Sequence, residues 1–235
     1  MNSPRIAMQR PFLVFAALAG LFAALFAAWS FVVFSQPSIA AFDLHLAETF
    51  AQQRDRAPLV RGLMIVATMS GGVRGNMVLA LGGAFWMWRH HRRRFALAWL
   101  VIAIGGGLII LEMKELFDRE RPPIALRDAI VKQDNESYPS GHAMGSLVGY
   151  GMVGFVLLQR VKNWPGRLLL FGTLTSWVIL IGMSRVYLRA HWLSDIVGGW
   201  LLGFTYVSAC LAIYFWRHLS TQPRPSAAQS ITNRP

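Results

Sequence analysis

The sequence predicts an all-α membrane protein, a bundle of six transmembrane helices with both termini on the cytoplasmic side. The chain of 235 residues is 54% hydrophobic and only 14% charged, whereas a soluble domain carries about a quarter charged residues. Long apolar runs recur along it, and a helix needs roughly 20 mainly apolar residues to cross the hydrocarbon core of a bilayer. Basic residues are also distributed unevenly among the segments that connect these runs, which indicates one orientation in the membrane.

Six segments are candidate spans. Five apolar runs have sufficient length: 11–42, 95–111, 143–159, 168–184 and 196–216. The first is too long for the apolar core of a signal peptide, so we expect it to remain as a span. Residues 59–88 are apolar too, but two arginines and a Ser-Gly-Gly sequence interrupt them. We therefore predict a short interfacial helix over 58–70 and a short span over 73–88.

The connecting segments orient this bundle. With a cytoplasmic N-terminus, the inner segments carry twelve Lys or Arg residues and no acid, while the outer segments carry the other 11 and all 11 acidic residues. The His-His-Arg-Arg-Arg sequence at 90–94 is the strongest anchor of this positive-inside pattern. Basic runs also occur in nucleic-acid-binding proteins, but this one is short and lies between spans, so we expect no nucleic-acid partner. Residues 1–218 are predicted to form one membrane domain, and the polar tail 219–235 to be disordered.

Three polar clusters fall on the outer face of the predicted bundle. They are KELFDRERP at 114–122, YPSGH at 138–142 and SRVYLRAHWLSD at 184–195. A lone basic residue at a helix end is often there only to reach the membrane surface, and Pro-Ser-Gly is an ordinary helix start. Neither explanation predicts that three cations, two histidines and a capped helix N-terminus lie on one side. Their coincidence indicates an anionic ligand.

A phosphate fits these residues. Phosphoryl transfer mainly requires positioning and positive potential around the phosphate oxygens. Arg121 and Arg185 offer planar forks and Lys114 a point charge; Lys114 and Arg121 are seven residues apart and would share one helix face if the third span continued that far. Ser140, as N-cap, and Gly141 begin the fourth span, where free backbone N–H groups favour an anion.

The third cluster supplies a reactive group. His191 and Asp195 are four residues apart, so at the head of the sixth span the carboxylate can accept a hydrogen bond from the protonated nitrogen of the imidazole. The other nitrogen then offers a lone pair, which can attack a phosphoryl group and form a phosphohistidine. His142 is the available proton donor for the leaving alcohol.

These motifs resemble those of the type 2 phosphatidic acid phosphatase superfamily. Its signatures Lys-x6-Arg-Pro, Pro-Ser-Gly-His and Ser-Arg-x5-His-x3-Asp all appear here, in order and complete, within residues 114–195. The resemblance implies a nucleophile His191, an acid His142 and an orienting Asp195, with no metal or other cofactor. It also implies a phosphate-binding set made of Lys114, Arg121, Ser140, Gly141 and Arg185.

The sequence therefore predicts an integral-membrane lipid phosphatase of the bacterial cytoplasmic membrane, with its active site facing the outside. Membrane members of the family act on phosphatidic acid, phosphatidylglycerol phosphate, undecaprenyl diphosphate or lipid A phosphates, and we expect head-group selection in segment 43–74. An anion or lipid transporter is a weaker alternative, because it would need cations throughout the membrane depth. A non-catalytic lipid-binding subunit is the other, although both histidines and Asp195 are present. The acids of segment 123–137, among them Asp128 and Asp134, are expected to form a solvated turn.

Overall fold

A computed structural model describes residues 4–52, 57–131 and 135–220 of the chain, without the side chains of residues 4–8 and 220. These ranges form helices and no strand, which confirms the all-α prediction. Of the tail predicted from residue 219, residues 221–235 lie outside the described residues. The helices are α1 (Pro4–Ser35), α2 (Pro37–Gln52), α3 (Pro58–Gly71), α4 (Val73–Arg89), α5 (Arg93–Phe117), α6 (Gly141–Leu158), α7 (Trp164–Tyr187) and α8 (Leu193–Ser220).

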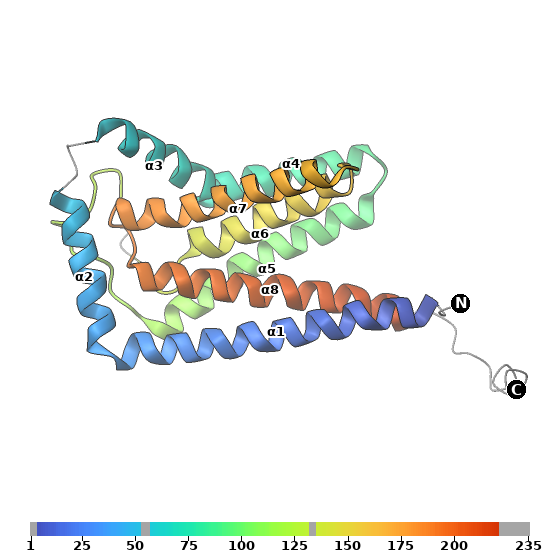
Figure 1. The fold of residues 1–235 in the computed structure, drawn as a ribbon, viewed down its shortest axis with the longest axis horizontal. Coiled ribbons are helices and arrows are strands. Elements are labelled where there is room, and N and C mark those ends of the chain that lie inside the picture. Colours follow the sequence, from blue (N-terminus) through green and yellow to red (C-terminus); the bar gives the residue numbers. More distant parts are fainter. Residues whose placement is uncertain (1–3, 53–56, 132–134, 221–235) are drawn as a thin grey trace, which may run out of the picture.

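The predicted spans are present in the described residues. Helices α1, α5, α6, α7 and α8 are long and apolar enough to cross a membrane, and α3 and α4 meet the same criterion as a pair bent by 51°. The long helices lie side by side in one bundle (Figure 1). We count α3 and α4 as one broken span. Their bounds match the helices predicted over 58–70 and 73–88, and the interfacial position of the first helix stays a prediction.

A different helix crosses the end of the bundle. The first apolar run was predicted to continue to residue 42, but α1 ends at Ser35. Pro37 begins α2, because proline lacks the N–H that would continue α1 yet suits the first position of a new helix. In Figure 1, α2 runs across the bundle axis at the end where α7 terminates and α8 begins. Its buried residues are Asp43 and Ala47, so an acidic side chain points into the protein from this helix.

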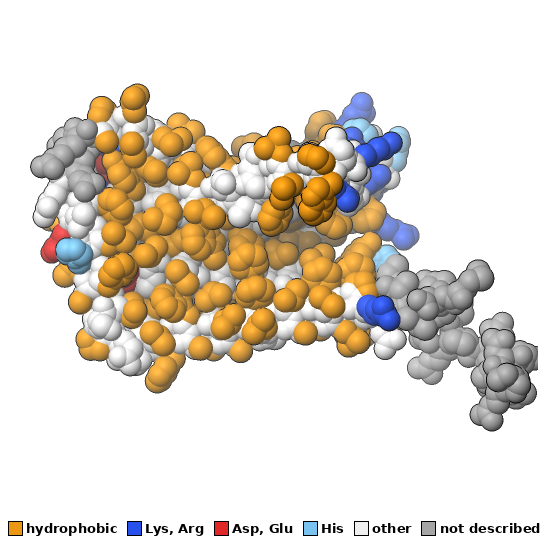
Figure 2. All heavy atoms as spheres, in the orientation of Figure 1, with side chains coloured by type: hydrophobic (Ala, Val, Ile, Leu, Met, Phe, Trp, Pro, Cys, Tyr) orange, Lys and Arg blue, Asp and Glu red, His pale blue; other side chains and the backbone are white. Residues whose placement is uncertain are grey.

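Charge is separated along the bundle axis. Figure 2 shows the visible Lys and Arg side chains gathered at the end that holds the α4–α5 and α6–α7 turns. Between the two ends lies a belt of exposed apolar side chains, for example Phe31 (72% exposed) and Leu169 (73%), as a lipid-facing surface requires. The segments predicted to be cytoplasmic thus lie together at one end. The end crossed by α2 is the opposite one.

Close helix packing brings distant parts of the chain together at the α2 end. A Cβ atom on Gly199 of α8 would lie 2.6 Å from the carbonyl oxygen of Ser140, and one on Gly198 would lie 2.6 Å from Oη of Tyr138. Only glycine permits this approach of α8 to the start of α6. This glycine pair therefore sets the spacing between the second and third polar clusters.

The segment between α5 and α6 is held by buried charge, which corrects the prediction of a solvated turn at Asp128. Asp128 is 2% exposed. Arg61 of α3 donates two hydrogen bonds to its carboxylate, both 2.8 Å long, and Nη2 of Arg189 lies 3.8 Å from Oδ2. Arg189 also donates to the carbonyl of Phe50 on α2. These contacts tie α2, α3 and the 118–140 segment into one frame; Asp134 lies outside the described residues.

Candidate active site

The three polar clusters lie at the same end of the bundle, as predicted. The first covers the last turn of α5 and the loop after it, and the second covers the loop before α6 and the start of that helix. The third runs from the last turn of α7 into the first turn of α8. Ser140 N–H donates to the carbonyl of Asp195 over 3.0 Å, which links the second cluster to the third. Nη1 of Arg121 donates to the carbonyl of Ala190 over 2.6 Å, which links the first cluster to the third. These bonds hold the predicted site residues in one place.

Lys114 and Arg121 do not share a helix face, which corrects that prediction. Helix α5 ends at Phe117, and Asp118 follows in the left-handed conformation with φ 40°, so Arg121 lies in the loop beyond it. The loop nevertheless returns the guanidinium to Lys114. Nζ of Lys114 and Nη2 of Arg121 both donate to the carbonyl oxygen of Glu136, the latter over 3.3 Å. Both cations are largely buried, and the shared acceptor places them side by side.

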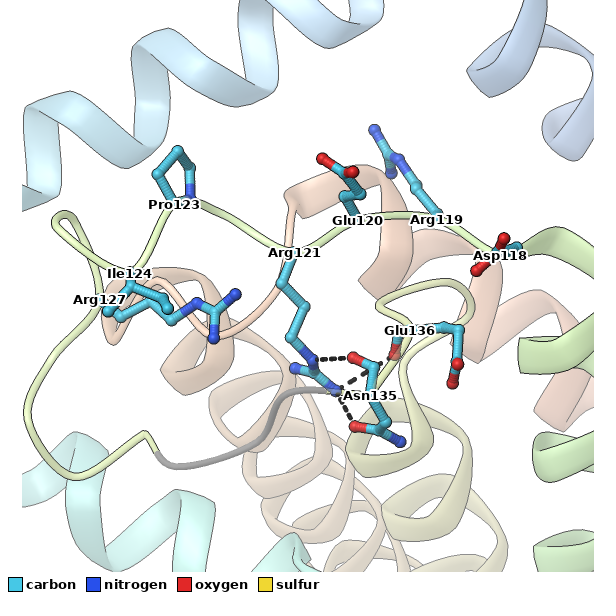
Figure 3. A pocket seen from close by; sticks show the side chains of 9 residues that line it. All are labelled: Asp118, Arg119, Glu120, Arg121, Pro123, Ile124, Arg127, Asn135 and Glu136. Carbon is cyan, nitrogen blue, oxygen red and sulfur yellow. Dashed lines mark hydrogen bonds between the residues drawn. The ribbon is translucent and has the colours of Figure 1, made fainter.

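The guanidinium of Arg121 is fixed by its neighbours. Nε donates to the backbone carbonyl of Asn135 over 2.6 Å and Nη2 to its side-chain oxygen over 2.9 Å. Figure 3 shows Arg121 extended toward Asn135, while Arg119, two residues earlier, points the opposite way. A pocket of about 340 Å³ lies beside Arg121, between the loop after α5 and residues 135–136. Arg121 is therefore pre-positioned and close to open space.

Arg185 completes the set of cations. It lies in the last turn of α7 and is 4% exposed. Its Nη1 donates a 2.7 Å hydrogen bond to Oγ1 of Thr68 on α3. Thr68 could not be predicted from the sequence, because a single threonine in an apolar helix gives no signal of its own. Segment 43–74, where we predicted head-group selection, thus contributes a side chain that orients a site cation.

We expect Thr68→Val to weaken phosphate binding about tenfold with a smaller effect on kcat. Valine keeps the shape of threonine but removes the acceptor for Arg185, and a hydrogen bond to a charged group contributes about 1.5–3 kcal/mol. The measurement is the inhibition constant of inorganic phosphate or vanadate. Ser70→Ala is the matched control, because the Ser70 hydroxyl is bonded to Ala67 and Trp177 and not to a site cation. Equal effects of both substitutions would contradict a specific role of Thr68.

The hydrogen bonds of His191 define its tautomer. Nδ1 lies 3.2 Å from Oδ2 of Asp195, and Nε2 lies 3.2 Å from Nη1 of Arg121. Arginine has only donors, so Nε2 must accept and Nδ1 must carry the proton. We had predicted that His191 lies at the head of the last helix, but α8 begins at Leu193, so His191 precedes it. The expected pairing of His191 with Asp195 is nevertheless present. The lone pair of Nε2 therefore faces the cation that we expect to hold phosphate.

The surroundings of His191 keep its imidazole neutral. Burial lowers the pKa of His191 well below 6.5, and the positive charges of Arg121, Arg185 and Lys114 lower it further. A hydrogen bond with the backbone of Ser137 acts in the opposite direction. The neutral, nucleophilic form is thus retained above pH 6.5 and is lost only as the pH falls through the lowered pKa.

The second cluster begins α6 as predicted. Ser140 is the N-cap, and its Oγ accepts from the N–H of Ala143 over 3.4 Å. A Cβ atom on Gly141 would lie 3.4 Å from Ile110 of α5, which is an ordinary contact distance, so packing against α5 does not require glycine here. His142 follows within electrostatic reach of the same three cations and of His191. A Cβ atom on Gly72, at the break between α3 and α4, would lie 3.1 Å from Nε2 of His142.

The described chain thus presents a helical membrane protein with a buried, cation-lined histidine site at one end of its bundle. Residues 95–219 match the PAP2 superfamily, which covers more than half of the chain. The chain belongs to this superfamily, in agreement with the motifs in its sequence.

Individual relatives match over shorter lengths. Phosphatidylglycerophosphatase B of Bacillus subtilis is 32% identical over 95 residues, 39% of this chain and 44% of that protein. A putative undecaprenyl-diphosphatase of Escherichia coli, YbjG, is 28% identical over 131 residues, 54% of this chain and 62% of that protein. Both matches span less than two thirds of the relative.

The fold also has a solved counterpart. The crystal structure of a transmembrane PAP2-type phosphatidylglycerolphosphate phosphatase from Bacillus subtilis superposes with a TM-score of 0.71 at 20% identity. The superposition covers 88% of this chain and 98% of that one. The likeness therefore extends to the bundle outside the motifs.

Proposed function

We propose that the protein is an integral-membrane phosphatase that hydrolyses a lipid phosphate or diphosphate through a phosphohistidine on His191. The observation that carries the proposal is the pair of contacts that His191 makes, with Arg121 at Nε2 and with Asp195 at Nδ1, from which we assign its tautomer. Its Nε2 lone pair faces Arg121, its Nδ1 proton is held by Asp195, and Lys114 and Arg185 add positive potential around the ring. These contacts support a role for neutral His191 as the nucleophile, beside the cations that we propose bind the phosphate oxygens.

The first step transfers the phosphoryl group to the protein. Nε2 of His191 forms the N–P bond as the bond from phosphorus to the leaving oxygen breaks, and the electron pair of that bond goes to the oxygen. His142 supplies the proton that the oxygen takes up. The imidazole becomes positively charged, because Nδ1 keeps its proton, and the carboxylate of Asp195 offsets this charge. Lys114, Arg121 and Arg185 bind the phosphate oxygens together with Ser140 and the Gly141 amide.

The second step returns the protein to its starting state. His142, now neutral, accepts a proton from water while the water oxygen attacks phosphorus. The N–P bond breaks, its electron pair returns to Nε2 of His191, and inorganic phosphate leaves. Both steps use only the side chains of this chain and water, and no metal ion is required.

The location of the site supports a membrane lipid as substrate. The cluster lies at the α2 end of the bundle, opposite the cation-rich end (Figure 2). Under the positive-inside rule the α2 end faces the outside of the cytoplasmic membrane. A head group at that surface can reach the site while its chains remain in the bilayer. The names of the relatives, a phosphatidylglycerophosphatase and an undecaprenyl-diphosphatase, indicate the lipid classes to test first.

Phosphate release from a panel of lipids tests this function. Purified protein in detergent is given phosphatidic acid, phosphatidylglycerol phosphate, undecaprenyl diphosphate and lipid A, each with and without EDTA. We expect release from at least one lipid, undiminished by EDTA and inhibited by vanadate. Loss of activity with EDTA, restored by a divalent ion, would contradict the metal-independent mechanism. Absence of release from every lipid would contradict the phosphatase itself.

A further inference from the structure

A second ion-pair cluster lies behind the nucleophile, on the side away from Arg121. Arg119 comes from the loop after α5, and its side chain is 13% exposed. Its Nη1 donates to Oδ1 of Asp195 over 2.6 Å and to Oγ of Ser194 over 2.7 Å. Its Nη2 donates to Oδ2 of Asp43 over 3.0 Å. One guanidinium is therefore shared between two carboxylates, which are 3% exposed at Asp43 and fully buried at Asp195.

Asp43 also fixes the start of α8. Its Oδ1 accepts the backbone N–H of Ser194 over 3.2 Å, and its Oδ2 is hydrogen-bonded to the Ser194 hydroxyl. From the other side, Nε1 of Trp29 on α1 donates to the carbonyl of Ser194 over 3.0 Å. The first turn of α8, which carries Asp195, is thus held by α2, α1 and the loop after α5.

The two oxygens of Asp195 have different partners. Oδ1 is bonded to Arg119, while Oδ2 accepts from Nδ1 of His191 and from the N–H of Trp192 over 3.0 Å. A buried carboxylate needs a charge partner to remain ionised, and the neutral His191 does not supply one. Arg119 supplies it. The strength of that pairing also decides how much negative charge Asp195 directs toward the imidazole.

We propose that Arg119, with Asp43 as its counter-ion, is a positioning residue. It controls how strongly the negative charge of Asp195 acts on His191, and it links the nucleophile to helix α2. The guanidinium of Arg119 is bonded to Asp195, Asp43 and Ser194, and no hydrogen bond to His191 is present among the described residues. It acts through Asp195, and Asp43 in turn limits how strongly Arg119 neutralises that carboxylate. This inference rests on the proposed phosphatase function.

Five charged or titratable side chains surround His191. Charged and titratable side chains reach His191 from the loop after α5, from α5, α6, α7 and α8; they are Arg121, Lys114, His142, Arg185 and Asp195. Tyr138 and Lys114 also interact electrostatically with Asp195, and Tyr138 with Arg119. Each of these groups is retained when Arg119 or Asp43 is replaced. A shift in the pH profile can then be attributed to the altered pair.

Removing either member of the pair should move the pH profile, and in opposite directions. Without the positive charge of Arg119, both His191 and Asp195 bind protons more readily. The acidic limb of the profile, where kcat falls as the pH is lowered, should therefore move to higher pH by about one unit in Arg119→Gln. We also expect kcat of this variant to fall by about tenfold or more. Without the negative charge of Asp43, Arg119 neutralises Asp195 more completely. Asp43→Asn should therefore move the acidic limb to lower pH. Arg119→Lys should restore most of the wild-type profile.

The assay is phosphate release against pH with one lipid phosphate in detergent, so that titration of the substrate is the same for every variant. Arg61→Gln is the matched control, because it breaks another arginine–carboxylate pair at this end of the bundle, with Asp128, that does not contact Asp195. Arg61→Gln should lower the thermal stability of the protein without moving the acidic limb of the pH profile. If Arg119→Gln does not fold, the downward shift in Asp43→Asn still tests the proposal.

Two results would overturn the inference while leaving the phosphatase function intact. One is an active wild type whose acidic limb is unchanged in both Arg119→Gln and Asp43→Asn. The other is a shift of the same sign and size in those variants and in Arg61→Gln, since a general loosening of the fold would produce it. An inactive wild type on every lipid contradicts the proposed function instead.

Discussion

Replacing His191 by alanine is expected to abolish turnover while leaving phosphate binding nearly intact. Removal of a catalytic nucleophile lowers kcat by roughly 10⁴- to 10⁶-fold. Binding persists because Lys114, Arg121 and Arg185 are held by contacts that do not depend on the imidazole alone: Arg121 keeps its bonds to Asn135, and Arg185 keeps its bond to Thr68. We therefore expect a large loss in kcat with a change in the affinity for inorganic phosphate of about threefold or less.

The measurement combines phosphate release with trapping of the covalent intermediate. Wild-type protein quenched during turnover of a ³²P-labelled lipid should retain label that is lost in acid and stable in alkali, as a phosphoramidate bond requires. His191→Ala should retain none. His45→Ala is the matched control, because the His45 side chain lies exposed on α2 and should behave as wild type. Trapped label or sustained turnover in His191→Ala would assign the nucleophile elsewhere.

The sequence was sufficient to predict the spans and the residues of the three motifs, because both leave local signals. Apolar length determines the spans, and the fixed spacings within each motif identify Lys114, His142 and His191. Their convergence at one end then followed from alternating the direction of successive spans. None of these inferences required knowledge of how one helix packs against another.

The supporting residues could not be predicted in this way, because their roles depend on long-range contacts. Asp43 and Asp195 are 152 positions apart in the chain, yet both bond to Arg119. Thr68 reaches Arg185 only because α3 packs beside α7. The prediction that Arg121 continues the face of α5 was wrong for a local reason, because the left-handed residue Asp118 ends the helix. The loop that follows nevertheless brings Arg121 beside Lys114.

The position of His142 gives the second large effect, which should depend on the leaving group. An alkoxide leaves poorly without a proton, so loss of the acid should slow phosphoryl transfer from a lipid phosphate by about 10²- to 10⁴-fold. An aryl phosphate such as p-nitrophenyl phosphate releases a stable anion and needs little protonation. His142→Ala should therefore still transfer the phosphoryl group of the aryl substrate to His191.

The second step distinguishes this role from a purely structural one. Hydrolysis of the phosphohistidine also uses His142, as the base that activates water, so it should be slow in His142→Ala whatever the substrate. The aryl phosphate should then give a burst of about one p-nitrophenol per protein with accumulation of labelled His191, followed by slow turnover. An alkyl phosphate should give no burst, because its transfer step is already slow. The double variant with His191→Ala should show no burst with either substrate.

Other outcomes assign His142 differently. A burst with both substrates would confine His142 to the hydrolytic step, since transfer would not need its proton. Absence of a burst with the aryl phosphate, in protein that still binds vanadate, would mean that His142 is required for the attack of His191 itself. We expect the two-step role, because His142 lies within electrostatic reach of His191 and of the three cations, so one side chain can exchange a proton in both steps.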